Sequence, residues 1–211
     1  MLYYVLDVET NGLKPGWHEI TQISVIRFED RHQLTRYIKI DHPERTSLEA
    51  LNNTGRIYAD LMKGGDAISA VNACEAFWNQ DGKTPEHRCM VAHNASFDKN
   101  FCHALWASLG KEFPVVCWLD TMKFMKEWAK KVGMVPKKFS LAEVLKFAKI
   151  NPIGEAHNAE SDTRNTYLLL DKGLKLGVDH LSSIKRWPHI TKVAEEKEIA
   201  ENKEEKEIEQ Q

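Results

Sequence analysis

The feature that most constrains this chain is a run of three strand-like segments at its N-terminus. Residues 3–9, 20–29 and 34–40 are rich in Val, Ile and Tyr, and the latter two alternate between apolar and polar side chains. This period of two is typical of half-buried β-strands. The second and third segments are joined by the polar stretch EDRHQ, which is typical of a hairpin. The pattern predicts an antiparallel meander.

After the meander, strand and helix patterns alternate. Apolar residues recur at helical spacing in five segments, and two short apolar runs between them are typical of strands. Ser140 and Glu143 stand at the spacing of a capping box before one of these helices. A meander followed by such alternation predicts an α/β fold with a mixed five-stranded sheet flanked by helices. The predicted helices are 68–78, 95–109, 122–131, 141–148 and 159–175, and the predicted strands are 88–94 and 115–120.

Composition narrows the class of protein. The chain has 211 residues, of which 42% are hydrophobic and 28% charged, as in ordinary globular domains. No apolar run approaches the roughly 18 residues of a membrane span, and no basic region precedes the N-terminal apolar stretch. We therefore expect a cytoplasmic protein without membrane association. Its four cysteines form no C-x-x-C pair, which disfavours a zinc ribbon and favours reduced, buried thiols.

Charge is unevenly distributed along the chain. Eight Lys and two Glu lie between Lys123 and Lys149, whereas residues 195–211 hold eight Glu and three Lys. A basic segment is compatible with a polyanionic partner, although such runs are also typical of solvated helix faces. We expect the acidic tail to be helical or disordered, dispensable for chemistry, and available to a separate protein partner.

Two acidic residues end the first predicted strand. Asp7 and Glu9 are two positions apart, so their carboxylates point to the same face. A divalent cation such as Mg²⁺ or Mn²⁺ would compensate their repulsion, because hard oxygen ligands suit these ions. An exposed pair of strand-end acids is the alternative.

Three further candidates stand beside later elements. Asp98 follows a predicted strand and lies in the first turn of the next helix, where it can converge with the first pair at the strand ends. His157 lies in a loop that begins near residues 152–154, and Asp162 lies five residues later in a helix. His93 and Asn94 are expected to be hydrogen-bonding residues of a turn rather than ligands.

In this order the segments D-x-E-T, H-N-A-x-F-D and H-N-A-x-x-D resemble the three motifs of the DEDD (DnaQ-like) 3′-to-5′ exonucleases. Histidine at 157 resembles the DEDDh branch, which includes the epsilon proofreading subunit of DNA polymerase III and ribonuclease T. The resemblance spans roughly residues 3–176. It implies a ribonuclease H-like fold, with an exonuclease domain at 1–178, an extension at 179–194 and the charged tail at 195–211.

The resemblance also implies roles for individual residues. Two divalent cations would be held by Asp7, Glu9, Asp98 and Asp162. His157 would be the general base, and the backbone at Thr10 would contact the 3′-terminal nucleotide. The segment 47–57 is similar to a family stretch that lines the terminal-nucleotide pocket.

The implied activity is 3′-to-5′ hydrolysis of single-stranded or frayed nucleic acid, with DNA favoured and nucleoside 5′-monophosphates released. Two alternatives remain open. One is an RNA-trimming exoribonuclease, since no motif reports contacts to the 2′-position. The other is a non-catalytic nuclease-fold module of a replication complex, which the presence of all four acids and the histidine disfavours.

Overall fold

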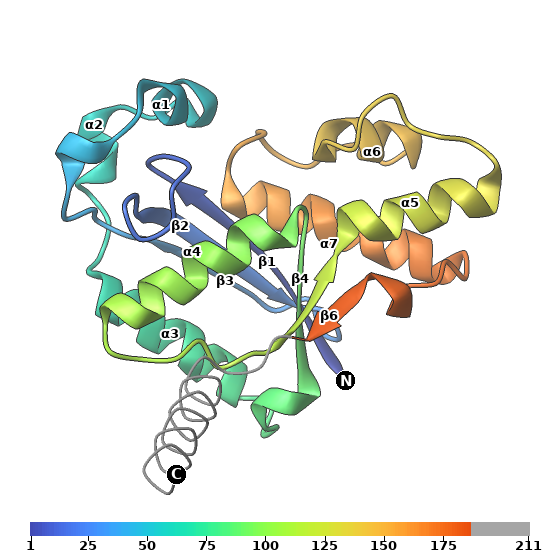
Figure 1. The fold of residues 1–211 in the computed structure, drawn as a ribbon, viewed down its shortest axis with the longest axis horizontal. Helices are drawn as coiled ribbons and strands as arrows, with labels where there is room; N and C mark the ends of the chain where they lie inside the picture. The colour runs from blue at the N-terminus through green and yellow to red at the C-terminus, as the bar shows by residue number, and fades with distance from the viewer. Residues whose placement is uncertain (187–211) are drawn as a thin grey trace, which may run out of the picture.

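The computed structural model describes residues 1–186. The predicted tail 195–211 and the end of the predicted extension therefore lie outside the described residues. Within the described part, the elements follow the predicted order of a meander and then alternating strands and helices (Figure 1).

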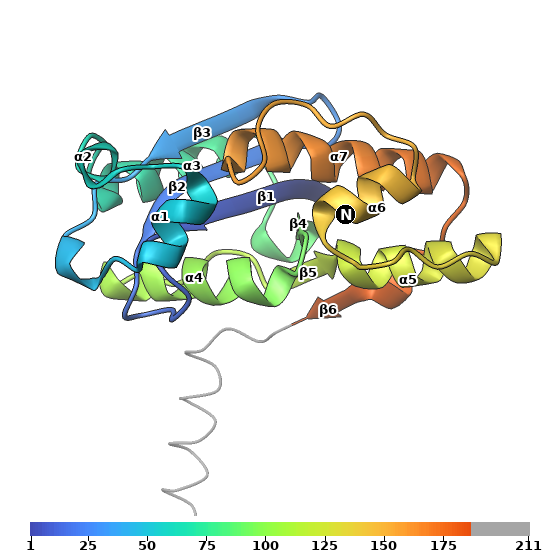
Figure 2. The same ribbon diagram turned by 90° about the horizontal axis from the view of Figure 1, so that it is seen from above.

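The centre of the fold is a mixed sheet of six strands in the order β3-β2-β1-β4-β5-β6. The first three strands are antiparallel neighbours, β4 pairs parallel with β1, β5 pairs parallel with β4, and β6 runs antiparallel to β5. Figure 2 shows the sheet with helices on both sides. The strands are β1 Leu2–Thr10, β2 Ile20–Arg27, β3 Gln33–Tyr37, β4 Arg88–Ala92, β5 Cys117–Asp120 and β6 Ile184–Arg186.

The α/β prediction is confirmed, but the sheet has six strands among the described residues rather than five. The additional strand, β6, has three residues and comes from the segment predicted to be an extension. Such a short strand carries no detectable alternation, and it forms because the edge of β5 offers unpaired backbone groups. The extension therefore contributes to the sheet.

The helices include two short ones that the pattern did not predict, α1 and α2. Ser140 occupies the N-cap position of α6, but its side chain makes no capping hydrogen bond, so the capping box predicted there is wrong. The helices are α1 Leu48–Thr54, α2 Tyr58–Leu61, α3 Ala67–Asn79, α4 Ala95–Ser108, α5 Thr121–Val132, α6 Leu141–Phe147 and α7 Ala159–Lys175, with 3₁₀ turns at Pro43–Arg45, Pro85–His87 and Leu181–Ser183.

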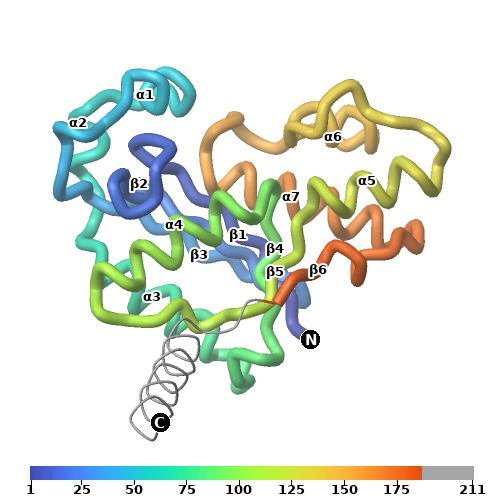
Figure 3. The backbone as a smooth tube through the Cα atoms, in the orientation of Figure 1, coloured from blue at the N-terminus to red at the C-terminus, as the bar shows by residue number. Residues whose placement is uncertain are grey.

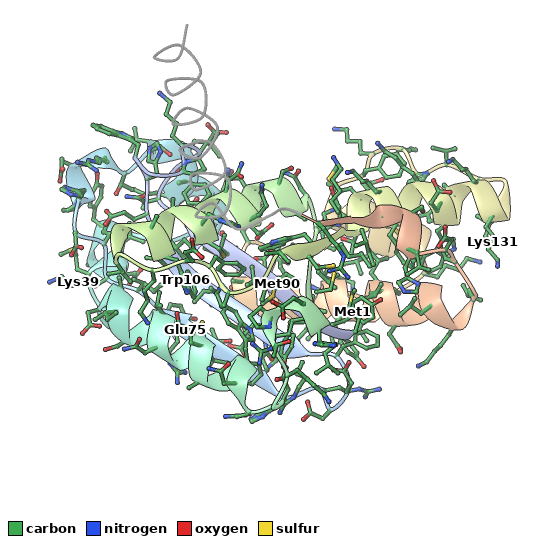
Figure 4. The ribbon with its side chains drawn as sticks, turned by 60° about the horizontal axis from the view of Figure 1, so that its bottom comes forward. Met1, Lys39, Glu75, Met90, Trp106 and Lys131 are labelled. Atoms are coloured by element: carbon green, nitrogen blue, oxygen red, sulfur yellow. The ribbon has the colours of Figure 1, made fainter. Side chains whose placement is uncertain are left out.

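Each face of the sheet carries its own core. Tyr4, Leu6 and Val8 of β1 pack with residues of α3 and α4, whereas Val5 packs with residues of α5, α6 and α7. The alternation of β1 thus assigns its odd-numbered side chains to the side of α7. On the other side, Trp106 of α4 donates to Glu75 Oε1 of α3 at 2.9 Å, and Figure 4 shows these two side chains between the helices.

The strand ends determine where a site can form. Because β1 and β4 are parallel, both finish at the same end of the sheet. Helices α1 and α6 lie at this end, on either side of it (Figures 1 and 3). The residues predicted to carry chemistry lie at the carboxyl end of β1, in the first turn of α4 after β4, and at the start of α7, so they converge there.

Candidate active site

Asp7 and Glu9 lie near the carboxyl end of β1, on the face that α7 covers. The register with β2 shifts between Glu9 and Thr10, so regular pairing ends where the acidic pair is presented. One carboxylate oxygen from each residue and one from Asp162 lie within 4.8 Å of one another. The spacing of two along a strand thus brings both carboxylates to the first turn of α7.

Asp162 is held by the segment that precedes its helix. The backbone N–H of His157 donates to Asp162 Oδ2 at 2.9 Å, and Asn158 caps α7 by accepting from Glu160 N at 3.0 Å. His157 has a φ of 59°, in the left-handed region that side chains with a Cβ rarely adopt. This turn directs the backbone N–H of His157 at the carboxylate, and His157 is also one of the residues that line the cleft described below.

Asp98 reaches the same region from α4 and is only 2% exposed. Its Oδ1 accepts from the backbone N–H of Val8 at 3.2 Å, so the carboxylate is anchored to β1 between the two strand acids. It lies outside the closest group of three oxygens. The structure therefore brings three predicted carboxylates together and places the fourth beside them.

These side chains line one cleft of about 330 Å³. One wall is the turn after β1, another is α1, and the third is the junction of β4 with α4. All six residues predicted for the site contribute to it. The lining residues are Asp7, Val8, Glu9, Thr10, Gly12, Leu13, Ser47, Glu49, Ala50, Asn53, Thr54, His93, Asn94, Phe97, Asp98, His157 and Asp162.

The carboxylates destabilise one another's charged forms. Burial raises the pKa of Asp7 well above its usual range, and the charges of Asp98, Glu9 and Asp162 raise it further. Burial, with the charge of Asp162, raises the pKa of Glu9 to about 7, although Arg56 opposes this. Burial raises the pKa of Asp98 to about 8. Such a cluster is stable in its charged form only beside a cation.

The donor set fits a divalent metal ion. Hard carboxylate oxygens at this separation suit Mg²⁺ or Mn²⁺. The raised pKa values indicate an uncompensated concentration of negative charge, which a divalent cation would neutralise. Asp7, Glu9 and Asp162 would hold such an ion, and Asp98 lies beside them.

Thr10 and His93 have roles inside the protein. The Thr10 hydroxyl donates to Gly12 O at 2.6 Å, and Thr10 is one of the residues that line the cleft. His93 Nε2 lies 2.7 Å from Phe139 O, a pure acceptor, so Nε2 carries the proton, and Nδ1 lies 2.9 Å from Thr121 Oγ1. Burial lowers the pKa of His93. This histidine therefore ties the 133–140 segment to the cleft.

Asn94 shapes the start of α4. It is the N-cap residue, has a φ of 71°, and donates from its backbone N–H to Asp120 Oδ1 at 3.3 Å. This agrees with the expected turn role.

Helix α1 forms a wall of the cleft, in agreement with the resemblance of segment 47–57, although the apolar pattern did not predict a helix there. Ser47 caps it by accepting from Ala50 N at 3.1 Å, and Gly55 ends it with a φ of 65°. A serine before and a glycine after seven residues are recognised helix boundaries, so this signal was present in the sequence. Glu49 and Asn53 of α1 face the cleft.

Comparisons with known proteins agree with this architecture. The family model RNase_T, described as "Exonuclease", matches residues 4–170. Among the similar curated proteins are PolC-type DNA polymerases III from Listeria monocytogenes, 30% identical over 59% of this chain, and from Staphylococcus saprophyticus, 24% identical over 82%. The chain spans only 8% and 11% of their lengths.

Solved structures share the fold at low sequence identity. Exonuclease X in complex with 5′-overhanging duplex DNA has a TM-score of 0.62 at 23% identity, and the match covers 86% of this chain and 96% of that one. E. coli Exonuclease I in complex with a dA16 oligonucleotide has a TM-score of 0.66 at 16% identity, covering 83% and 41%. The nuclease domain of 3′hExo bound to rAMP, a DEDDh member, has a TM-score of 0.67 at 12% identity, covering 90% and 97%. In the described part of this chain, no helix is long and apolar enough to cross a membrane.

Proposed function

The chain belongs to the exonuclease family represented by RNase_T, and from this premise we propose that it is a metal-dependent 3′-to-5′ exonuclease of the DEDDh type. The observation that carries the proposal is the convergence of Asp7, Glu9 and Asp162 within 4.8 Å in a cleft that Asp98 and His157 also line. Its substrate is a single-stranded or frayed 3′ end, and its products are nucleoside 5′-monophosphates.

Asp7, Glu9, Asp98 and Asp162 would hold two divalent cations, Mg²⁺ or Mn²⁺. When bound, these ions favour ionisation of a water molecule and offset charge on the phosphate and the leaving oxygen. Asp7, Glu9 and Asp162 offer the closest set of oxygens, and Asp98, fixed by Val8 N–H, completes it.

His157 acts as the general base. Its exposed ring at the edge of the cleft removes a proton from the attacking water, whose oxygen then bonds to phosphorus. The bond from phosphorus to the 3′-oxygen of the preceding nucleotide breaks, and that oxygen keeps the bonding electrons and takes up a proton to become the new 3′-hydroxyl. The terminal nucleotide leaves with its 5′-phosphate. The turn at Thr10 and the wall formed by α1 hold that nucleotide.

DNA is the favoured polymer. The similar PolC-type proteins are DNA polymerases, and two of the solved structures named above, Exonuclease X and Exonuclease I, are in complex with DNA. RNA trimming is the second candidate, favoured by the similarity to a nuclease domain bound to rAMP. A non-catalytic binding module is disfavoured because every proposed catalytic side chain lines the cleft.

A degradation assay tests the proposal. DNA and RNA strands of one sequence, labelled at the 5′ end, are incubated with Mg²⁺, Mn²⁺ or EDTA. We expect a ladder that shortens from the 3′ end with either metal, 5′-monophosphate products, and no reaction in EDTA. Cleavage of circular single strands, or release from the 5′ end first, would contradict it.

A further inference from the structure

The segment that carries His157 is fastened to the sheet by a buried glutamine on β2. Gln22 is directly opposite Glu9 in the β1·β2 register, and its side chain is 0% exposed. Its Nε2 donates to Asn158 Oδ1 at 3.2 Å, and its Oε1 accepts from Ala159 N at 3.2 Å. Both partners immediately follow His157.

These hydrogen bonds fix the position of His157 from its C-terminal side. Ala159 N is one of the first N–H groups of α7, which have no partner within the helix, and Gln22 satisfies it inside the protein. In addition, the backbone N–H of His157 itself donates a hydrogen bond to Asp162. The backbone of His157 is therefore clamped between a strand and the helix that carries a proposed metal ligand.

The same glutamine connects to the opposite wall of the cleft through Arg56. Arg56 Nη2 donates to Gln22 Oε1 at 2.6 Å, Nη1 donates to Thr21 Oγ1 at 3.3 Å, and the guanidinium lies 5.0 Å from the centre of the Tyr37 ring. Arg56 directly follows Gly55, where α1 ends. One buried amide thus joins α1 to the start of α7.

We propose that Gln22 and Arg56 are positioning residues that hold the general-base segment in register with the α1 wall. This proposal rests on the proposed function, because it takes His157 as the base. Neither residue lines the cleft, so neither touches the reacting atoms. Gln22 acts through His157, and Arg56 acts through Gln22 in addition to its charge, which favours the ionised form of Glu9. A displacement of about 1 Å at a catalytic group can cost roughly 10²-fold in rate.

The chain offers a matched control in Gln33 of β3. Gln33 Nε2 also donates to the first turn of α7, to Glu160 O at 3.1 Å, and Arg164 of α7 donates to its Oε1. It is a second glutamine that fastens α7 to the sheet, but its bonds lie beyond His157 and Asn158. Methionine matches glutamine in length, so Gln22→Met and Gln33→Met each remove hydrogen bonds while conserving volume.

The test compares kinetics and histidine ring spectra in the two variants. For Gln22→Met we expect kcat to fall roughly 10- to 100-fold with KM within about threefold, and for Gln33→Met we expect both within about twofold. Ring ¹H–¹³C signals, with that of His157 assigned through His157→Gln, should shift or broaden for His157 only in Gln22→Met. Because the spectra need no turnover, they test the positioning even if the chain proves inactive as a nuclease.

Arg56 is less buried than Gln22 and provides a second site for substitution. Arg56→Met should lower kcat roughly 3- to 10-fold and perturb the His157 signal, and Arg56→Lys should restore part of both, because lysine keeps the charge but not the two-pronged donor. Equal loss of kcat in Gln22→Met and Gln33→Met would overturn the proposal. So would a fall in kcat with an unchanged His157 signal, or an altered signal with wild-type kcat.

Discussion

The backbone N–H of His157 donates to the carboxylate of Asp162 at 2.9 Å, so the proposed base and a proposed metal ligand are parts of one local turn. The bond uses the backbone of His157 and not its imidazole ring, and His157 lines the cleft. Moving either residue therefore moves the other. Because the bond involves only the backbone of residue 157, a substitution can remove the imidazole ring without removing the hydrogen bond that holds the turn.

His157→Gln should lower kcat by roughly 10²- to 10⁴-fold, the usual contribution of a positioned general base. The backbone N–H remains, so binding of Mn²⁺, measured by titration calorimetry, should change little. His42→Gln, at a surface histidine outside the cleft, is the control and should retain wild-type rate. A His157→Gln enzyme with wild-type kcat would transfer the role of base to another group.

Replacing any one of Asp7, Glu9, Asp98 and Asp162 by its amide should remove activity by roughly 10³-fold or more, because each proposed ligand orders both the nucleophile and the charge on phosphate. Glu49→Gln is the matched control, since Glu49 lines the same cleft outside the carboxylate cluster. It lies on the α1 wall proposed to hold the nucleotide, so its replacement can weaken binding but should leave the single-turnover rate of the saturated complex nearly unchanged. Single-turnover rates with saturating Mg²⁺ measure the effect. Comparable losses in Glu49→Gln and Asp7→Asn would argue against a metal centre at this cluster.

Local patterns determine much of this fold. Alternation in β1 predicts that Asp7 and Glu9 share a face, and the structure has them together with Asp162. The order of strands and helices predicts the α/β class. These inferences succeed because side-chain periodicity depends only on backbone geometry.

Features that depend on tertiary contacts were not predicted. β6 has three residues and forms only because the edge of β5 is present. Gln22 occupies a polar position of an alternating strand, and nothing in the sequence shows that its amide is buried against α7. The strand order allows Asp98 to converge with the acids of β1 only if β1 and β4 are neighbours, and that pairing, like the contact of Asp98 with Val8 across 90 residues, is a tertiary feature.

Metal binding should stabilise the protein more at pH 8 than at pH 5. Burial and mutual repulsion raise the pKa of Glu9 to about 7, and burial raises that of Asp98 to about 8. A carboxyl group with a raised folded-state pKa favours folding below its unfolded-state pKa and loses that contribution as the pH rises through the folded value. The metal-free protein therefore loses stability as the pH rises from about 4 to 8. Over the same interval the carboxyl groups lose the protons that compete with the metal ion.

Thermal unfolding with Mn²⁺ and with EDTA at each pH measures this difference. The increase in Tm due to Mn²⁺ should be larger at pH 8 than at pH 5 by roughly 5 °C or more. Asp7→Asn, which removes one charge from the cluster, should abolish most of that pH dependence. An increase in Tm that is the same at both pH values would show that these carboxyl groups do not bind the ion.

The basic segment should contact nucleic acid through only part of its length. The basic segment between Lys123 and Lys149 is compatible with a polyanionic partner, and two neighbouring pairs of lysines within it differ in their contacts. Lys130 pairs with Glu127 at 2.6 Å, and Lys131 donates to Gly177 O at 2.7 Å at the far end of the molecule (Figure 4). Lys137 and Lys138 are exposed and directly precede Phe139, whose carbonyl oxygen binds the cleft residue His93.

Charge reversal in pairs separates the two sets. Binding of a labelled single strand to an inactive Asp7→Asn protein should weaken with salt, with a slope near −0.7 for each phosphate contact. Reversing Lys137 and Lys138 to Glu should flatten this slope by roughly 1 to 1.5 and raise KM more than it lowers kcat in the active enzyme. The same reversal at Lys130 and Lys131 is the matched control and should change neither, apart from a small fall in Tm from their lost partners. An equal slope in both double variants and the parent would show that these lysines serve only to solvate the surface.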